Sequence, residues 1–278
     1  MLDPTKPHAQ QHDTGAVVHD VIDSPHHPVA RRVKDVLRSR SAKPRTVVID
    51  DLENIEQALR SGIRLDSLYL TEGLPPESLA DAAVGCRGLP TFTLSRAVAG
   101  DLFGEEKRTR VFALAHAPRP TALADLSRRA GDIVVLDGVR LMGNIGAITR
   151  TVMALGAAGL VLLESGLRTV LDRRLIRASR GLVFSVPLVL ATRGEFARYA
   201  AHGRLTLATL TAEADEPLHS IQEVPGRVAV ILGSERHGVS AELDALAAHR
   251  YAIAMSPEVE SLNVSVSAAI ALYERSRV

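Results

Sequence analysis

The sequence predicts an α/β protein built in two parts. Short apolar strands alternate with helical segments along most of the chain, and Pro118 and Pro120 interrupt this alternation. Such a break between two runs of strands and helices is typical of a domain boundary. A chain of 278 residues has room for two ordinary domains. We therefore expect a leader over 1–28, a first domain over 29–118 and a second over 119–278.

The leader is expected to be disordered. It holds five of the ten histidines, with little apolar periodicity. A His-rich tract can bind metal, but these histidines have no regular spacing, so we expect no metal site. The leader also lacks the apolar core of a signal peptide, and no apolar run approaches the roughly 18 residues that span a bilayer. With Cys86 as the single cysteine, these features favour a cytoplasmic protein without disulfides or a membrane partner.

The first domain is expected to be a small α/β unit, because its apolar residues switch between the periods of strands and helices. Strands are predicted at 46–50, 65–73, 91–94 and 111–118. Helices are predicted at 52–62, 77–86 and 97–104.

Two stretches of this domain carry candidate RNA-binding residues. Seven cations between residues 31 and 45, among them Arg38 and Arg40, stand against one acid. They suit a phosphate-binding arm or, alternatively, a solvated helix face. Further along, an exposed Phe103 beside three cations would suit base stacking and phosphate contact. The three cations are Lys107, Arg108 and Arg110. The alternative places Phe103 in the core and the cations on a solvated loop.

The second domain is expected to hold a parallel sheet. Its first strands, 132–139 and 159–165, are apolar runs of the kind buried on both faces. The segment 168–181 then places Arg173, Arg177 and Arg180 on one face of a predicted helix. Only one acid lies among its five arginines. Because unpaired like charges repel, we expect a phosphate-binding face here in preference to a solvated one.

The glycines after the strand 132–139 allow a different interpretation. Gly138, Gly143 and Gly146 precede a helix, and Glu164 ends the next strand. This order imitates a dinucleotide-binding unit with its ribose-binding acid, although the tight G-x-G-x-x-G is absent. A nicotinamide-dependent oxidoreductase is therefore one alternative, and an RNA-binding protein without activity is another.

Three motifs lead to a more specific hypothesis: NIGAITR at 144–150, ILGSERHG at 231–238 and SLNVSVS at 261–267. Together, and in this order, they resemble the three motifs of the SpoU branch of the SPOUT RNA methyltransferases. From about Arg31 to Glu274 the chain also resembles the thiostrepton and nosiheptide resistance methyltransferases. It departs from them in its longer leader, in His237 at a position where a small residue is expected, and in Gly104–Glu105, which replaces a more basic pair.

This resemblance implies a C-terminal SPOUT domain with a trefoil knot, and an N-terminal domain similar to a ribosomal protein. It implies a homodimer formed through the C-terminal domain. The implied activity is transfer of a methyl group from S-adenosylmethionine to the ribose 2′-oxygen of an adenosine in 23S rRNA, which confers resistance to thiopeptide antibiotics such as thiostrepton. Another rRNA nucleotide or a tRNA is the alternative substrate within the family.

The resemblance also assigns site residues. The implied catalytic residues are Arg150, Asn144, Glu235, Ser261 and Asn263. The implied donor-binding residues are Leu210, Gly233, Ser234, Glu235, Ile253 and Leu262. Arg180 matches a family arginine near the target phosphate. A guanidinium is a poor base, since its pKa exceeds about 12. Arg150 could instead stabilise an alkoxide or hold a phosphate, with the amide oxygen of Asn144 fixing its guanidinium. Ser261 and Asn263 are also suitable N-caps for the last helix.

Overall fold

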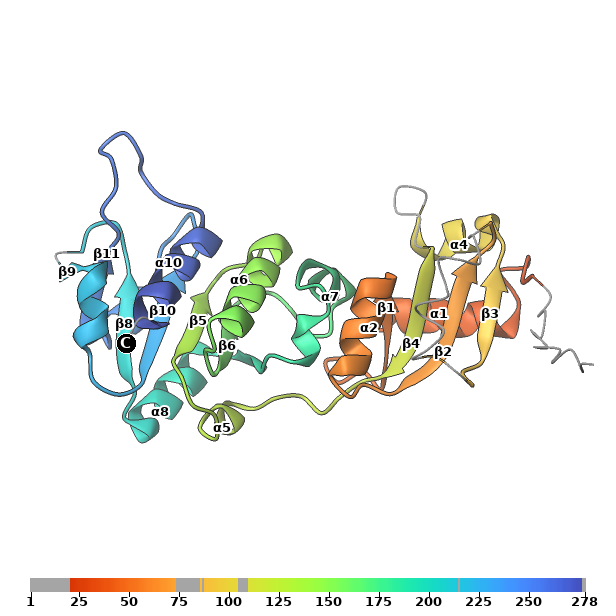
Figure 1. The fold of residues 1–278 in the computed structure, drawn as a ribbon, viewed down its shortest axis with the longest axis horizontal. Helices are drawn as coiled ribbons and strands as arrows, with labels where there is room; N and C mark the ends of the chain where they lie inside the picture. The colour runs from red at the N-terminus through yellow and green to blue at the C-terminus, as the bar shows by residue number, and fades with distance from the viewer. Residues whose placement is uncertain (1–20, 74–85, 87, 105–109, 215, 277–278) are drawn as a thin grey trace, which may run out of the picture.

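The computed structural model describes residues 21–73, 86, 88–104, 110–214 and 216–276 of the chain. Two sheets lie side by side along the long axis of the molecule (Figure 1). The strands of the first sheet come from residues 46–116, and those of the second from residues 133–252. None of the helices in the described part of the chain is long and apolar enough to cross a membrane.

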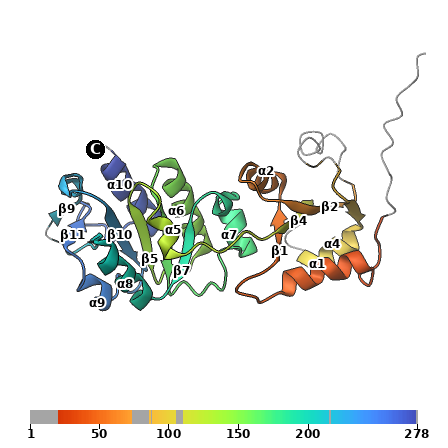
Figure 2. The same ribbon diagram turned by 90° about the horizontal axis from the view of Figure 1, so that it is seen from below.

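The first sheet has four strands in the order β1-β4-β2-β3. Their bounds are β1 Thr46–Asp50, β2 Leu65–Thr71, β3 Thr91–Leu94 and β4 Val111–His116. Strand β4 runs antiparallel to β1 and β2, and β3 is parallel to β2. Helices α1 (Pro28–Arg38) and α4 (Arg96–Phe103) cover one face, and α2 (Leu52–Arg60) lies on the other (Figure 2). The four predicted strands are therefore present, and the predicted helix 77–86 lies almost wholly outside the described residues.

The segment before α1 corrects one expectation. Ile22 is buried, its N–H donates to the Thr93 carbonyl at 2.8 Å, and its own carbonyl accepts from Ser95 N–H at 2.9 Å. The prediction of disorder up to residue 28 is therefore wrong for residues 21–28, because Ile22 is held against the end of β3 and Pro28 begins α1. Residues 1–20 lie outside the described residues.

The second sheet has seven parallel strands in the order β7-β6-β5-β10-β8-β11-β9. Their bounds are β5 Ile133–Asp137, β6 Gly159–Leu163, β7 Leu188–Ala191, β8 Thr206–Leu210, β9 Glu216–Pro217, β10 Val228–Gly233 and β11 His249–Ala252. Every residue of β5 and β6 is buried, as expected of strands covered on both faces.

Helices cover both faces of this sheet. On one face lie α6 (Met142–Ala154) and α10 (Val264–Ser276) (Figure 2). On the other face lie α5 (Leu123–Leu126), α8 (Arg193–Gly203) and α9 (Ala241–Asp244). Helix α7 (Arg173–Ala178) packs on α6 and also reaches β1 of the first sheet. A Cβ at Gly146 would lie only 2.6 Å from the Ala178 carbonyl oxygen, so a glycine allows α6 and α7 to approach closely.

Helix α7 is shorter than predicted. It ends at Ala178, and Arg180 (φ 53°) and Gly181 (φ 75°) both have left-handed backbones. The prediction that Arg180 extends the helix face of Arg173 and Arg177 is therefore wrong, because a left-handed residue ends the helical repeat.

The strand order brings two distant segments together. A dinucleotide-binding sheet places its first five strands in the order 3-2-1-4-5. Here β10, the sixth strand of this sheet in chain order, lies between β5 and β8. Gly233 at the end of β10 is thus paired with Asp137 at the end of β5. The turn after β10 consequently lies beside the loop that leads into α6.

Candidate active site

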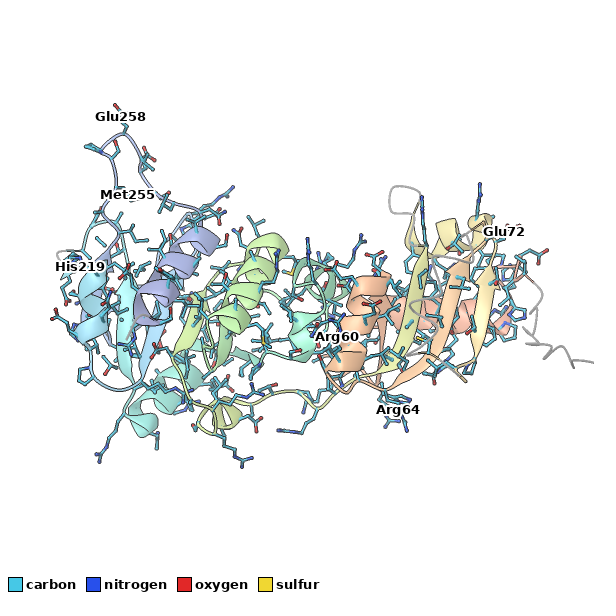
Figure 3. The ribbon with its side chains drawn as sticks, in the orientation of Figure 1. Arg60, Arg64, Glu72, His219, Met255 and Glu258 are labelled. Atoms are coloured by element: carbon cyan, nitrogen blue, oxygen red, sulfur yellow. The ribbon has the colours of Figure 1, made fainter. Side chains whose placement is uncertain are left out.

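A cavity of about 360 Å³ opens at the carboxyl ends of β8, β10 and β11. All six predicted donor-binding residues line it: Leu210, Gly233, Ser234, Glu235, Ile253 and Leu262. Ser261 lines it too, and so does Met255, on the loop that joins β11 to α10. Figure 3 shows Met255 and Glu258 on this loop, which projects from the body of the second sheet. The structure thus brings together residues that are up to 52 positions apart, counting from Leu210 to Leu262.

Gly233 allows the wall of this cavity to close. A Cβ at this position would lie 1.9 Å from the carbonyl carbon of Gly238 and 2.1 Å from the Val239 nitrogen. Such a contact is impossible, so only glycine permits the chain to fold back on itself here. The turn is held by the Gly238 N–H, which donates to the Ser234 carbonyl at 2.8 Å. The sequence GSERHG therefore forms a tight turn whose backbone lines the cavity.

Three predicted catalytic side chains form a hydrogen-bonded series at the edge of the cavity. The Asn144 amide donates to the Glu235 carboxylate at 2.8 Å. The Asn263 amide in turn donates to Asn144 Oδ1 at 3.2 Å. Asn263 Oδ1 accepts from the Ser265 N–H at 2.8 Å, and so caps the start of α10 as predicted. One side chain from each of the three motifs is thus joined to the next, and we call this set the Asn-Glu-Asn cluster.

Arg150 does not belong to the cluster within one chain. It lies six residues after Asn144 on α6, which turns it about 120° around the helix from Asn144. Its side chain is exposed and has no hydrogen-bond or ion-pair partner among the described residues. Within one chain Asn144 Oδ1 accepts from Asn263 and does not contact Arg150, so a contact between Asn144 and the Arg150 guanidinium stays a prediction.

A second cavity, of about 550 Å³, lies on the other side of the turn after β10. Asn144 and Glu235 line it, together with Arg140, Leu141 and Glu164. At its base the buried Asp137 accepts from Arg193 Nε and from the Ser240 N–H, both at 2.8 Å. Sequence reasoning missed Asp137 and Arg193, although a carboxylate that ends an apolar strand was a usable signal.

Residues 132–273 match the SpoU rRNA methylase family, and residues 19–129 match the N terminus of the thiostrepton-resistance methylases. The chain belongs to the SpoU rRNA methylase family. It is 43% identical over 258 residues to the 23S rRNA (adenosine(1067)-2′-O)-methyltransferase of Streptomyces laurentii, covering 93% of this chain and 96% of that one. It is 38% identical over 257 residues to the protein of the same name from Streptomyces azureus, covering 92% and 95%.

A solved structure agrees. A crystal structure of an RNA 2′-O ribose methyltransferase superposes with a TM-score of 0.75 at 30% identity, covering 92% of this chain and 98% of that chain. The oxidoreductase alternative is therefore wrong. Its glycines serve the turn before α6 and the packing of α6 on α7, and Glu164 is exposed beside the second cavity.

In this SpoU-family chain, the arginines predicted to bind phosphate contact carboxylates at the end of β1 and directly after it. Arg173 Nε donates to the buried Asp50. Arg177 lies 3.6 Å from the Asp51 carboxylate, and Arg180 lies 3.2 Å from that of Glu53. The expectation that these cations lack acid partners is wrong, because the acids come from a segment more than 120 positions away in the sequence. Their roles in RNA binding stay predictions.

Burial dominates the chemistry of Asp50. Desolvation raises the pKa of this carboxyl above its usual value, and the charge of Arg173 opposes that rise. Its Oδ1 has no hydrogen-bond partner within the described part of the chain. The Arg173 contact is therefore the main stabilisation of a charge that lies between α7 and the first sheet.

The remaining predicted RNA-binding residues differ in their exposure. Phe103 is half-buried, its ring packs edge-on against Phe112 at 4.8 Å, and the Arg173 guanidinium lies 4.5 Å from its centroid. The expectation of an exposed stacking ring is wrong, since the ring packs on the core and on a cation. Three of the predicted cations, Arg38, Arg40 and Arg110, are exposed. Two others, Lys107 and Arg108, lie outside the described residues.

Proposed function

We propose that this chain transfers a methyl group from S-adenosylmethionine to the ribose 2′-oxygen of an adenosine in 23S rRNA, and that it thereby confers resistance to thiopeptide antibiotics such as thiostrepton. The observation that carries the proposal is the Asn-Glu-Asn cluster beside a cavity lined by all six predicted donor-binding residues. The full-length likeness to two enzymes named for this reaction supports it.

The first cavity suits the methyl donor. Its volume is within the range of small-ligand sites, and its lining combines apolar Leu232, Ile253 and Leu262 with backbone groups of the turn after β10. Those backbone groups can bind the polar edges of an adenosine, while the apolar side chains contact its faces. When bound, S-adenosylmethionine supplies a methyl group on a positively charged sulfur.

The second cavity suits the acceptor ribose, because the Asn-Glu-Asn cluster lies between it and the first. Glu235 lines both cavities and has one carboxylate oxygen fixed by Asn144. A fixed carboxylate can accept a hydrogen bond from a ribose hydroxyl and so direct the 2′-oxygen toward the donor. The capped start of α10 holds Asn263 and therefore the whole series in place.

We propose that the cation needed at the reacting oxygen is Arg150 of a second copy of the chain. Arg150 projects away from the Asn-Glu-Asn cluster of its own chain, and the helices α6 and α10 expose apolar side chains. These are Met153 (51% exposed), Val266 (45%) and Tyr273 (55%). An apolar surface on α6 and α10 supports the proposed homodimer, in which Arg150 of one copy would reach the reacting oxygen or an adjacent phosphate in the other. Val264, Ala268 and Leu272 of α10 are buried in the core of their own chain.

Three further proposals concern the fold and its setting. A trefoil knot is supported by the path of the chain, which leaves β11 and returns past β8 to place α10 against α6 and β10. A first domain that docks on rRNA is supported by the match over residues 19–129. A cytoplasmic location follows from ribosomal RNA as the substrate.

The test is transfer of a labelled methyl group to purified 23S rRNA and, separately, to tRNA, followed by alkaline hydrolysis. A blocked 2′-hydroxyl makes the adjacent phosphodiester resistant to alkali. Label in an alkali-resistant dinucleotide from 23S rRNA is the expected result. Label in tRNA alone would contradict the proposed substrate, and no transfer to either RNA would contradict the proposed activity.

A further inference from the structure

Three arginines of the segment 173–180 form ion pairs with the first sheet and the residues after β1, so unpaired positive charge lies elsewhere in the described part of the chain. Arg173 contacts Asp50, the last residue of β1, and Arg177 and Arg180 contact carboxylates that follow this strand. They are partly neutralised, so they are weaker phosphate ligands than their spacing in the sequence suggests. Other cations line two adjoining cavities between the sheets. Two of them, Arg40 and Lys43, belong to the predicted basic arm, and the other two, Arg129 and Arg168, come from the second part of the chain.

These two cavities form one channel. The first, of about 480 Å³, lies between the end of α1 and the loop 166–174. The second, of about 540 Å³, continues past the linker 118–121 to the edge strand β7. Both are lined by Pro44, Arg168, Thr169 and Leu171. We call the pair the inter-sheet groove.

The groove carries an excess of positive charge. Among the described residues two carboxylates line it, and each already has a cation: Asp172 contacts Arg174 at 2.9 Å, and Asp125 contacts Arg119 at 3.0 Å. Four exposed lining cations remain without an acid partner among the described residues: Arg40, Lys43, Arg129 and Arg168. Four unpaired charges along one channel favour a chain of regularly spaced anions over a single small anion.

The walls of the groove also favour a nucleic acid over a purely anionic polymer. Leu171, Phe184 and Leu190 give it an apolar side, and Phe184 is half-buried. Sugars and bases have apolar faces that can pack on such a surface while their phosphates contact the cations. An acidic peptide would leave this apolar side less well covered.

The groove leads to the candidate active site. Arg168 follows Glu164 by four residues, and Glu164 lines the cavity that also holds Asn144 and Glu235. Four residues span at most about 14 Å of extended chain. An RNA strand whose target nucleotide occupies that cavity can therefore continue into the groove.

We propose that the inter-sheet groove binds the phosphate backbone of the RNA substrate next to the target nucleotide, with Lys43 and Arg168 facing it from the two sides. The identity of the RNA rests on the proposed function. The contact itself rests on the four unpaired cations and on the apolar wall that they flank.

The test compares two double variants that remove the same charge. Lys43→Ala with Arg168→Ala removes one groove cation from each side. Arg60→Ala with Arg198→Ala removes one exposed cation outside the groove from each part of the chain, and Figure 3 shows Arg60 on α2. Binding of a 23S rRNA fragment is measured by filter retention between 50 and 300 mM salt, which is roughly the range over which counterion release is resolved.

In the groove variant we expect the slope of log affinity against log salt concentration to decrease in magnitude by about 1.5. We also expect this variant to bind RNA at least roughly tenfold more weakly at 0.1 M salt. S-adenosylmethionine binding, measured by calorimetry, should stay at the wild-type value, which shows that the variant is folded. An unchanged slope in the groove variant would overturn the proposal, and so would an equal loss in the control variant.

The outcome separates this proposal from the proposed function. If the wild-type protein transfers no methyl group but the groove variant still loses slope, the groove is an RNA site and the proposed function fails. If transfer occurs with normal salt dependence in the groove variant, the function stands and the groove proposal fails.

Discussion

Replacing Arg173 by alanine should destabilise the protein more than loss of any exposed arginine in the same segment. Asp50, its partner, is 0% exposed, and its other oxygen has no hydrogen bond among the described residues. Removing one member of a buried ion pair costs about 3–5 kcal/mol, because the remaining charge stays buried without compensation. The lost contact with the Phe103 ring adds to this cost by about 0.5–2 kcal/mol. Arg180→Ala is the matched control, since the Arg180–Glu53 pair is 59% and 62% exposed and exposed pairs contribute less than about 1 kcal/mol.

The cost should depend on pH in a defined direction. Burial already raises the pKa of Asp50 above 3.8, and Arg173 opposes the rise. Without Arg173 the pKa of folded Asp50 rises further, so the folded state binds a proton more tightly than the unfolded chain does. Stability of the variant then increases as the pH falls through that raised pKa toward 3.8. The destabilisation is therefore largest above that raised pKa and becomes smaller as the pH falls through it.

Urea unfolding at two pH values measures both effects. Circular dichroism is the suitable probe, because the chain has no tryptophan. We expect a loss of about 3–5 kcal/mol at neutral pH and a smaller loss at an acid pH close to 3.8. Asp50→Asn added to Arg173→Ala should recover part of the stability. A loss below about 1 kcal/mol, or one equal at both pH values, would contradict a stabilising contact between Arg173 and the buried Asp50.

Three further substitutions test the candidate site. Gly233→Ala places a Cβ 1.9 Å from the Gly238 carbonyl carbon, so it should abolish donor binding measured by calorimetry, and wild-type affinity would contradict this. Asn263→Ala should lower stability by about 1 kcal/mol through loss of the cap. Asn263→Asp keeps the cap acceptor but cannot donate to Asn144, so we expect a normal melting temperature with methyl transfer reduced at least tenfold. Full activity of the aspartate variant would show that the contact with Asn144 is dispensable. Arg150→Ala should abolish transfer while donor binding persists, and measurable turnover would remove Arg150 from the reaction.

The sequence identified the elements and the motif residues well, for physical reasons. The strands β5 and β6 are uninterrupted apolar runs, because helices cover both of their faces. The donor-cavity residues came from the resemblance to a known family, and Leu210 and Ile253 lie outside the three motifs. Gly233 has a local physical reason as well, since the tight turn after β10 requires a glycine there. A capping asparagine before α10 was likewise readable, since its short side chain reaches the backbone of the first turn.

The sequence did not allow us to predict which distant residues form ion pairs or which strands lie side by side. The carboxylates that pair with Arg173, Arg177 and Arg180 lie at 50–53, where they resemble the end of a strand and the start of a helix. Local charge counting therefore assigned those arginines to RNA. The position of β10 between β5 and β8 was also hidden, because apolar period does not encode which strand pairs with which.

The central claim is that one ribose oxygen of an adenosine in 23S rRNA receives the methyl group. The most direct measurement is mass spectrometry of the nucleosides and of nuclease fragments from 23S rRNA incubated with the protein and S-adenosylmethionine. We expect 2′-O-methyladenosine at a single position, absent when Arg150→Ala replaces the wild-type protein. A methyl group on a base, on another nucleoside or on no RNA at all would contradict it.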